Sequence, residues 1–359
     1  MDYGPILQVI TDNDRRGAQV FADDLHDSLT RLGVNVRTVA LAPASGPGSL
    51  DFDVLGPGRR HPRTLRALRR AIRESSVVVG HGSTTLPMCA LASRSLSVPF
   101  VYRQISEQRF WVNTRGRYLR TRAALSTADH LVALWRGAKE VLVSDFGVAA
   151  ERVTIIPNGV PSERCQLVDA DARFAARQRF GLDPDAPTLL SIGAFVPEKG
   201  VDILVSAMEE QALAGWQLLL VGAGPERDRL EELASRAPSG SVLVNDPVVS
   251  GAEAIAAADV IGLTSRGGDS MPAVLIEAGM MGVPAVATPV EGIVDIVLDG
   301  RTGRLVERED PFATAEAVAH VGARRFEFGR AARQHCISKF EMEAVGAQWK
   351  AVLDQFGTT

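Results

Sequence analysis

The sequence has no long hydrophobic run. No apolar stretch reaches the ~18 residues that a transmembrane helix needs. The first residues, MDYGPILQVITDNDRRG, lack the basic start and the apolar segment of a signal peptide. Since 46% of the 359 residues are hydrophobic, the chain still has enough apolar side chains to bury two cores of ordinary size. We therefore expect two globular domains in a cytoplasmic protein.

Cysteine and lysine are both scarce. Cys89, Cys165 and Cys336 lie far apart without metal-ligand spacing, so we expect them to be reduced and buried. Only four of the 39 basic residues are lysine, and the charge is uneven. Residues 1–165 carry 22 Lys and Arg against 15 Asp and Glu, a balance of +7, whereas residues 166–359 carry 17 against 28, a balance of −11. The basic half predicts an anionic partner, either a phosphorylated acceptor or an anionic membrane; the acidic half and the lack of a binding motif argue against nucleic acid.

Short apolar runs alternate with helical patterns along the whole chain, which is typical of parallel sheets covered by helices. The turn-rich segment PNGVPSERC, residues 157–165, separates two series of such runs. The first series predicts strands at Ile6–Ile10, Val34–Leu41, Val77–Val79, Phe100–Tyr102, Leu131–Ala133 and Val153–Ile156. The second predicts strands at Thr188–Ile192, Trp216–Val221, Ser241–Val244, Val260–Thr264 and Ala285–Thr288. A final helix is expected over Lys339–Phe356, with Phe340, Val345, Trp349 and Leu353 on one face.

One stretch, TSRGGDSMPAVLIEAGMMGVPAVATPVEG, places two carboxylates, Asp269 and Glu277, around the start of one helix. Ser270 is the expected N-cap, Pro272 is expected in the first turn, and Gly282 is expected to end the helix. A glycine loop before a helix N-terminus attracts phosphate, while carboxylates grip hydroxyl groups. The combination predicts a sugar phosphate or a sugar nucleotide as ligand.

Together with further motifs, this stretch resembles the retaining GT-B glycosyltransferases of glycosyltransferase family four. The motifs are Gly17-Ala18-Gln19 after the first strand, IIPNGV in the linker, IGAFVPEKGVDIL and VGAGPERDRLEEL. The resemblance implies two Rossmann-like doubly wound domains facing across a cleft: an acceptor-side domain over residues 1–163 and a nucleotide-sugar-binding domain over residues 164–338. Residues 339–359 would form a helix that packs on the first domain.

The resemblance also assigns roles to residues. Glu277 would accept hydrogen bonds from the ribose hydroxyls, with a solvated helix residue as the alternative. Asp269 would hold the donor sugar, where the family has glutamate, with support of a tight turn as the alternative. Lys199 would neutralise the departing diphosphate. The family's arginine after Gly193 is replaced by Ala194, so Arg266 is the candidate substitute, with an ordinary surface arginine as the alternative. The nucleotide sugar would be bound by Gly17, Gly193, Lys199, Gly222, Gly268, Asp269, Ser270, Met271, Pro272 and Glu277.

The first domain departs from the family as well, because Ile105 stands where many members have histidine. His81 is the nearest replacement as a substrate-contacting catalytic residue, with a structural histidine as the alternative. We expect neither cofactor nor metal. The metal-binding pattern Asp-x-Asp of the other main glycosyltransferase fold occurs three times here, at Asp51/Asp53, Asp169/Asp171 and Asp183/Asp185, always outside a suitable strand end.

Seven arginines follow nearly helical spacing between Arg59 and Arg73, interrupted by aliphatic residues. This segment is expected either to dock peripherally on an anionic membrane at its inner face or to be an ordinary basic surface helix. The overall prediction is a retaining transferase that moves a sugar from a nucleoside diphosphate to an acceptor hydroxyl on a lipid, glycan or phosphorylated small molecule. The alternatives are a sugar-nucleotide-binding protein with weakened or lost activity and, less favoured, a dinucleotide-dependent oxidoreductase suggested by Gly222-x-Gly224.

Overall fold

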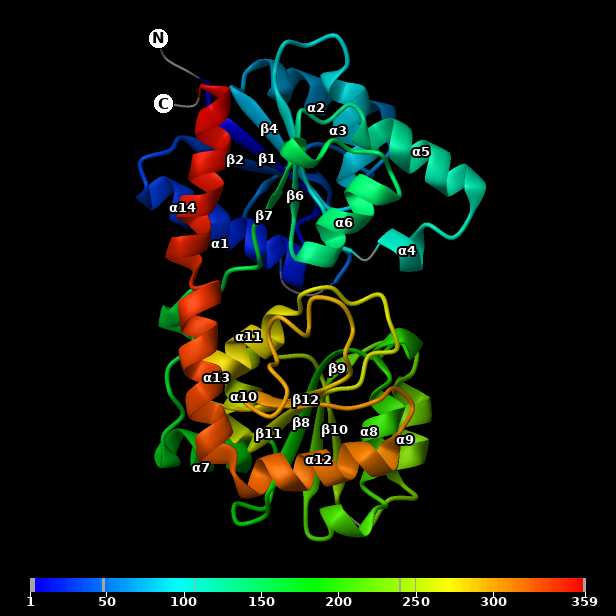
Figure 1. Cartoon of the computed structure of the whole chain (residues 1–359), viewed down its shortest axis with the longest axis vertical. Coiled ribbons are helices and arrows are strands. Elements are labelled where there is room, and N and C mark those ends of the chain that lie inside the picture. Colours follow the sequence, from blue (N-terminus) through cyan, green and yellow to red (C-terminus); the bar gives the residue numbers. More distant parts are fainter. Residues whose placement is uncertain (1–3, 47–48, 107, 239, 249, 358–359) are drawn as a thin grey trace. The chain divides into compact units, whose positions relative to one another are not determined.

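The structure is a computed structural model that describes residues 4–46, 49–106, 108–238, 240–248 and 250–357. The chain divides into two compact units (Figure 1). Unit 1 comprises residues 1–160 together with residues 340–359, and unit 2 comprises residues 161–339. None of the helices in the described part of the chain is both long and apolar enough to cross a bilayer.

Unit 1 is built on a seven-stranded parallel sheet in the order β3-β2-β1-β4-β5-β6-β7. Its central strands are almost wholly buried, as expected where helices cover both faces. The chain moves outward from β1 in one direction and returns to place β4 on the other side, so the strand order reverses between β1 and β4. The strands are β1 (Ile6–Asp12), β2 (Val36–Ala42), β3 (Asp53–Val54), β4 (Val77–His81), β5 (Phe100–Arg103), β6 (His130–Ala133) and β7 (Val153–Ile155).

The C-terminal helix belongs to unit 1, where it packs beside α1. A β carbon added at Gly346 would lie 2.1 Å from Ser28 Oγ, so glycine is needed for the two helices to approach this closely. Met342, Val345 and Trp349 join the core formed by α1 and the sheet. The helices of this unit are α1 (Gly17–Arg31), α2 (Pro62–Arg73), α3 (Thr85–Ser93), α4 (Gln108–Trp111), α5 (Arg115–Leu125), α6 (Arg136–Ser144) and α14 (Met342–Leu353).

Unit 2 is built on a six-stranded parallel sheet in the order β10-β9-β8-β11-β12-β13. Here the strand order reverses between β8 and β11. The strands are β8 (Thr188–Ala194), β9 (Gln217–Ala223), β10 (Val242–Asn245), β11 (Val260–Leu263), β12 (Ala285–Ala287) and β13 (Gly303–Leu305).

Helices cover both faces of this second sheet. α8 packs beside α9 and α12 on one face, and α10 packs beside α7 and α11 on the other. The first face buries the larger apolar core, which includes Leu204, Leu218, Leu230 and Val318. The helices are α7 (Ala170–Arg179), α8 (Val201–Ala207), α9 (Arg227–Ala234), α10 (Gly251–Ala257), α11 (Ala273–Met280), α12 (Pro311–Ala323) and α13 (Arg325–Phe340).

Several local expectations are confirmed and others are wrong. The three cysteines are free and buried, and Gly282 follows α11 with a left-handed φ of 78°, as a helix stop requires. Ser270 is not the N-cap: α11 begins at Ala273, and Pro272 stands at the N-cap position, where its side chain makes no capping hydrogen bond. Pro272 therefore precedes the first turn rather than lying within it, because its preferred backbone conformation suits an extended N-cap, here φ −68° and ψ 120°.

The expected final helix is divided in two at Glu341, whose side chain accepts a hydrogen bond from the Met342 backbone at 3.0 Å. Its predicted apolar face is confirmed, since Phe340, Val345, Trp349 and Leu353 are all buried.

Candidate functional site

The carboxyl ends of β8 and β11 form the reversal point of the unit 2 sheet. Open parallel sheets bind ligands at such a point, because the loops leaving the two strands diverge there. β8 is followed by a short 3-10 turn, Pro197–Lys199, and β11 is followed by the loop that leads to α11. Most of the residues predicted for the donor site lie on these two loops.

Lys199 and Asp269 meet across the reversal point. The Lys199 ammonium donates to Asp269 Oδ1, and the Ser265 hydroxyl donates to Asp269 Oδ2. The Lys199 side chain is 25% exposed and the Asp269 side chain 13% exposed. The structure thus brings together a cation and a carboxylate that lie 70 residues apart in the sequence, at a place that solvent still reaches.

Close backbone approach fixes the position of this pair. Gly200 has a left-handed φ of 59°, and a β carbon there would lie 2.2 Å from the Thr264 carbonyl oxygen. The Thr264 hydroxyl donates to the Gly200 carbonyl at 2.7 Å. Any other residue at position 200 would push the Lys199 turn away from the loop that carries Asp269.

Gly193 and Gly222 lie side by side at the ends of β8 and β9, where they are register partners. A β carbon at Gly222 would come within 1.9 Å of the Gly193 carbonyl oxygen. Ala194 follows at the exposed end of β8, so no cationic side chain extends from the position where the resemblance led us to expect arginine. Together these small residues leave the backbone open beside Lys199.

Glu277 lies in the middle of α11, close to the start of α10. A β carbon at Gly251 would be 3.4 Å from Glu277 Oε2 and 3.5 Å from Ile192 at the end of β8. No hydrogen bond to the Glu277 carboxylate is found within the described ranges of the chain. Burial raises the pKa of Glu277 above its ordinary 4.5, and the nearby Arg164 partly opposes that rise. A partly buried carboxylate without a protein donor is suited to accept hydrogen bonds from a ligand's hydroxyl groups.

The loop between Gly268 and Pro272 carries the remaining predicted donor contacts. Gly268 adopts φ 75°, and Met271 is buried. The Ser270 carbonyl packs against Gly292, where a β carbon would lie 2.2 Å from that oxygen. The N-cap residue, Pro272, has no side chain that can accept a hydrogen bond from the first backbone N–H groups of α11.

Arg266 is held by carboxylates rather than directed toward Asp269. Its guanidinium donates to both oxygens of Asp202, at 2.8 and 3.0 Å, and to both oxygens of Glu309, at 2.5 and 3.0 Å. Nη1 also donates to the Pro197 carbonyl at 2.8 Å. These bonds hold all five N–H groups of the side chain, so the geometry favours a role in fixing the loop over direct contact with a diphosphate.

Gly17 begins α1 immediately beyond the reversal point of unit 1. A β carbon added there would meet no atom within 4 Å, so the space beside it is open. The neighbouring Asp12 accepts hydrogen bonds from Arg59 at 2.5 Å and from Gln19 at 2.8 Å. Arg59 is therefore held against the end of β1.

His81 lies at the carboxyl end of β4 but is 2% exposed. Its Nε2 bonds to Gln8 Oε1 at 3.0 Å, and its Nδ1 faces Arg103 Nη1 at 3.4 Å. Burial, assisted by the Arg103 charge, lowers the pKa of His81 well below 6.5. The imidazole is neutral at pH 7 and its ring nitrogens bond to protein groups, which favours the structural alternative over substrate contact.

Three further residues complete this arrangement: Ser265, Asp202 and Glu309. Ser265 and Asp202 lie within the quoted motifs and Glu309 lies outside them, but the sequence analysis gave none of the three a role. Each supports another side chain through a hydrogen bond. The three Asp-x-Asp pairs lie outside this arrangement; Asp53 pairs with Arg37, Asp169 caps α7, and Asp183 accepts a hydrogen bond from the Asp185 backbone.

Two family models match the chain. The model described as Glycosyltransferase Family 4 matches residues 15–164, and the model described as Glycosyl transferases group 1 matches residues 186–323. The two models together reach both units and include every residue of the candidate site.

Curated relatives align over most of the chain. The D-inositol 3-phosphate glycosyltransferase of Geodermatophilus obscurus is 32% identical over 330 residues, which covers 84% of this chain and 72% of the relative. The GDP-mannose-dependent alpha-(1-6)-phosphatidylinositol monomannoside mannosyltransferase of Mycolicibacterium smegmatis is 29% identical over 82% of this chain and 83% of the relative. The chain spans about half the length of several other relatives.

A solved structure of Anabaena HepE in complex with UDP and glucose has the same fold. It superposes with a TM-score of 0.86, covering 98% of this chain and all of HepE, at 18% sequence identity. At this identity the likeness concerns the fold alone.

Proposed function

The chain belongs to glycosyltransferase family 4, and on that premise we propose that it transfers a sugar from a nucleoside diphosphate to an acceptor hydroxyl with retention of configuration. One observation carries the proposal: the Lys199–Asp269 pair lies at the reversal point of the unit 2 sheet, with the Glu277 carboxylate on the helix that follows. A cation, a sugar-binding carboxylate and a ribose-binding carboxylate are the three groups that a nucleotide sugar requires.

Each group has a defined task in the proposed reaction. Glu277 accepts hydrogen bonds from the ribose hydroxyls and fixes the nucleotide. Lys199 leaves Asp269 to face the diphosphate and stabilises the negative charge that develops as the sugar departs. Asp269, held by Ser265, then binds sugar hydroxyls and supports positive charge at the anomeric carbon. Gly193, Gly222, Gly268, Ser270, Met271 and Pro272 form the backbone surface that unit 2 offers to the donor.

The proposed mechanism needs no strong protein base. The departing diphosphate oxygen accepts the proton of the incoming hydroxyl on the same face of the sugar, so retention follows without a covalent enzyme intermediate. The protein contributes positioning and charge stabilisation. Because the guanidinium of Arg266 is held by Asp202 and Glu309, we assign it to positioning the loop that carries Asp269.

For the acceptor we propose a phosphorylated polyol or its lipid ester. The named relatives act on inositol 3-phosphate and phosphatidylinositol monomannoside, and unit 1 carries the basic excess of this chain. An anionic acceptor would be attracted by that excess.

A direct test measures nucleoside diphosphate release from UDP-, GDP-, ADP- and dTDP-sugars with inositol phosphate as acceptor, and the anomeric configuration of the product by NMR. We expect one donor to support turnover with retention. Replacing Lys199→Met should lower kcat on the order of 10²–10³-fold, the effect of removing one stabilising donor. The exposed Lys339→Met is the matched control and should leave kcat unchanged.

Two results would contradict the proposal: an inverted product, or equal activity of the two lysine variants. A second candidate function, a sugar-nucleotide-binding protein without turnover, is favoured by Ala194 and by the engagement of Arg266 in carboxylate pairs. Donor binding without release of diphosphate from any sugar in the panel would select that candidate.

A further inference from the structure

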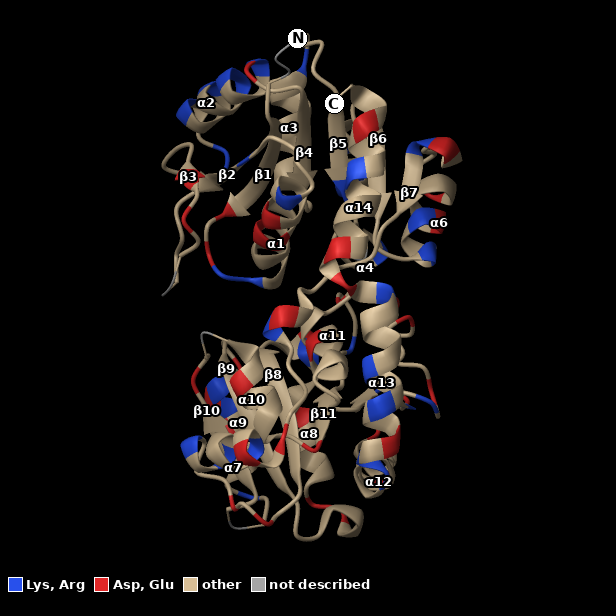
Figure 2. Cartoon of the chain, turned by 90° about the vertical axis from the view of Figure 1, so that its left-hand side faces the viewer, with Lys and Arg blue, Asp and Glu red and all other residues tan. Residues whose placement is uncertain are grey.

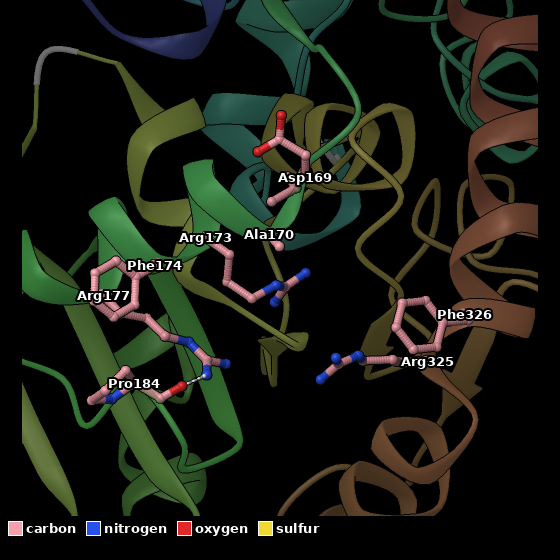
Figure 3. Close-up of a pocket in the computed structure, with 9 residues that line it drawn as sticks. Asp169, Ala170, Arg173, Phe174, Arg177, Pro184, Arg325 and Phe326 are labelled. Carbon is pink, nitrogen blue, oxygen red and sulfur yellow. Dashed lines mark hydrogen bonds between the residues drawn. The ribbon is translucent and has the colours of Figure 1, made fainter.

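A cavity of about 270 Å³ lies beside the amino-terminal ends of β8 and β11, at the opposite end of these strands from the candidate site. Asp259 directly precedes β11, and its Oδ2 accepts a hydrogen bond from the Thr188 backbone at 2.8 Å. Because β8 and β11 are parallel, their amino-terminal ends lie together, and the loops that carry Lys199 and Asp269 follow their carboxyl ends. Figure 3 shows the side chains that line the cavity.

Three arginines surround the single buried carboxylate of Asp259. Arg173 Nη1 lies 3.0 Å from Oδ1, Arg177 Nη2 lies 2.6 Å from Oδ2, and Arg325 also pairs with Oδ1. The Asp259 side chain is 1% exposed. One carboxylate cannot neutralise three guanidinium groups, so the cluster has a surplus of two positive charges.

The surplus charge faces the cavity. In Figure 3 the guanidinium groups of Arg173 and Arg325 point toward one another, whereas the carboxylate of Asp169 points away from them. Asp169 is engaged as the N-cap of α7, accepting from the Ala172 backbone at 2.8 Å. Arg325 Nε is buried and has no hydrogen-bond partner among the described residues. Burial and the two neighbouring arginines lower the pKa of Arg173, with Asp259 opposing the shift.

Two helices also begin at this place. α7 begins at Ala170 and α13 begins at Arg325, and both residues line the cavity. The Asp169 carboxylate already caps α7, so it is the N-terminus of α13 that adds a partial positive charge to the field of the arginines.

Aromatic side chains form part of the cavity wall. Phe174 is 51% exposed and Phe326 is 75% exposed, which is high for side chains of this size. The Arg325 guanidinium lies 4.7 Å from the centroid of the Phe326 ring. A flat apolar group seated against Phe326 would cover its ring while an attached anion reached the arginines.

We propose that this cavity is a binding site for a phosphomonoester that carries a flat apolar or aromatic group. Such a phosphate bears a charge of about −1.5 to −2 at neutral pH, which matches the surplus of two positive charges. Arg325 supplies a guanidinium whose side chain is 34% exposed, Arg173 supplies charge from the opposite side, and Phe326 covers the flat group. The site is separate from the proposed donor site, so its ligand binds without displacing the nucleotide.

Calorimetric titration with phenyl phosphate tests the proposal on the full chain. We expect saturable 1:1 binding that is weakened at least tenfold by Arg325→Gln and is unchanged by Arg330→Gln, an exposed arginine on the same helix. Asp259 keeps two arginine partners in Arg325→Gln, and Arg173→Gln serves as a second variant should the first not fold. Absence of saturable binding, or equal binding by the position 325 and 330 variants, would overturn the proposal.

Further arms identify what is recognised. Phe326→Ala should weaken phenyl phosphate at least threefold while leaving inorganic phosphate unchanged, and benzoate should bind at least tenfold more weakly than phenyl phosphate. Binding that is lost in Lys199→Met but kept in Arg325→Gln would place phenyl phosphate in the donor site and overturn the proposal. Equal affinity for benzoate and phenyl phosphate would contradict recognition of a dianion.

Discussion

At the residue scale, the candidate site contains one ion pair, Lys199–Asp269, and one carboxylate, Glu277, without a hydrogen-bond donor among the described residues. Asp269 and Lys199 neutralise each other, whereas Glu277 lies partly buried without a hydrogen-bond donor among the described residues. Keeping a carboxylate in such surroundings costs folding free energy, which is typical of residues retained for binding. A bound ligand whose hydroxyl groups donate hydrogen bonds to Glu277 would offset that cost.

This cost leads to a prediction for Glu277→Gln. Because folding raises the pKa of Glu277 above 4.5, the folded state holds this proton more tightly than the unfolded state. The protonated Glu277 carboxyl therefore makes its full contribution to the free energy of unfolding below pH 4.5, and this contribution is lost as the pH rises through the raised pKa. At pH 7 the variant should be more stable than the wild type by about 1 kcal/mol, or roughly 2–4 °C in Tm.

Thermal unfolding without ligand at pH 7 and pH 4.5 measures this effect. The difference should shrink at the lower pH, and Glu316→Gln, an exposed glutamate on α12, should leave Tm unchanged at both. A lower Tm for Glu277→Gln at pH 7 would show that the carboxylate is stabilised within the fold.

At the element scale, alternation of apolar runs predicted the strands but not their finer features. All eleven predicted strands occur at or within two residues of the apolar runs, as β1, β2, β4, β5, β6, β7, β8, β9, β10, β11 and β12. β3 and β13 were not predicted, because strands of two or three residues, such as Asp53–Val54, carry too little pattern to be recognised. The N-cap at Pro272 was missed for a different reason: Ser270 has the preferred chemistry, but the contact of its carbonyl with Gly292 holds it before the helix.

The packing of α14 on α1 predicts that Trp349 is essential to unit 1. Trp349 is fully buried, and its ring centroid lies 6.2 Å from that of His81. Trp349→Ala should destabilise unit 1 by ~3–5 kcal/mol, the usual cost of removing a large buried aromatic side chain. Urea unfolding checks this, with the exposed Gln348→Ala on the same helix as control. Equal midpoints for the two variants would mean that α14 contributes little to this core.

The basic segment around α2 is divided between structural and exposed arginines. Arg59 pairs with Asp12, and Arg69 donates to the carbonyls of Ala92 and Arg94. Figure 2 shows basic residues along α2. Arg63, Arg66, Arg70 and Arg73 are exposed there. The expected membrane contact, which stays a prediction, therefore depends on these four.

Cosedimentation with vesicles containing anionic lipid tests that contact. Changing Arg63, Arg66 and Arg73 to Gln should weaken binding on the order of 100-fold, since each basic residue near the surface contributes ~1 kcal/mol. A matched variant with Gln at Arg301, Arg308 and Arg330 of unit 2 keeps the same net charge and should still bind. Equal loss in both variants, or no binding by the wild type, would leave α2 as an ordinary basic helix.

At the scale of the whole molecule, the sequence was sufficient for the family and the fold. The expected membership of glycosyltransferase family 4 and the expected pair of Rossmann-like domains of the GT-B type are both confirmed. Strand alternation and ordered motifs carry that information locally. The ion-pair network of Arg266 with Asp202 and Glu309 could not be predicted, since its members lie in a loop, in the first turn of α8 and in a second loop, and no spacing in the sequence links them.

The contacts of Arg266 favour a role in holding its loop in place over the direct contact with the diphosphate that was expected. Its position beside Asp269 suggested a free cation, but sequence spacing does not reveal which carboxylates the fold brings to it. His81 is a parallel case, because a strand-end histidine can be recognised in a sequence whereas the burial around it cannot. Both residues remain open as functional predictions, with supporting roles favoured by their contacts.

The central claim is that unit 2 binds the nucleotide through Glu277, and nucleotide affinity tests it most directly. Calorimetric titration with UDP, GDP, ADP and dTDP should identify at least one ligand of the wild type. Loss of two charge-assisted hydrogen bonds should weaken that ligand on the order of 10²-fold or more in Glu277→Gln, while Glu316→Gln binds as the wild type does. Unchanged affinity in Glu277→Gln, or no binding of any of the four to the wild type, would contradict the account.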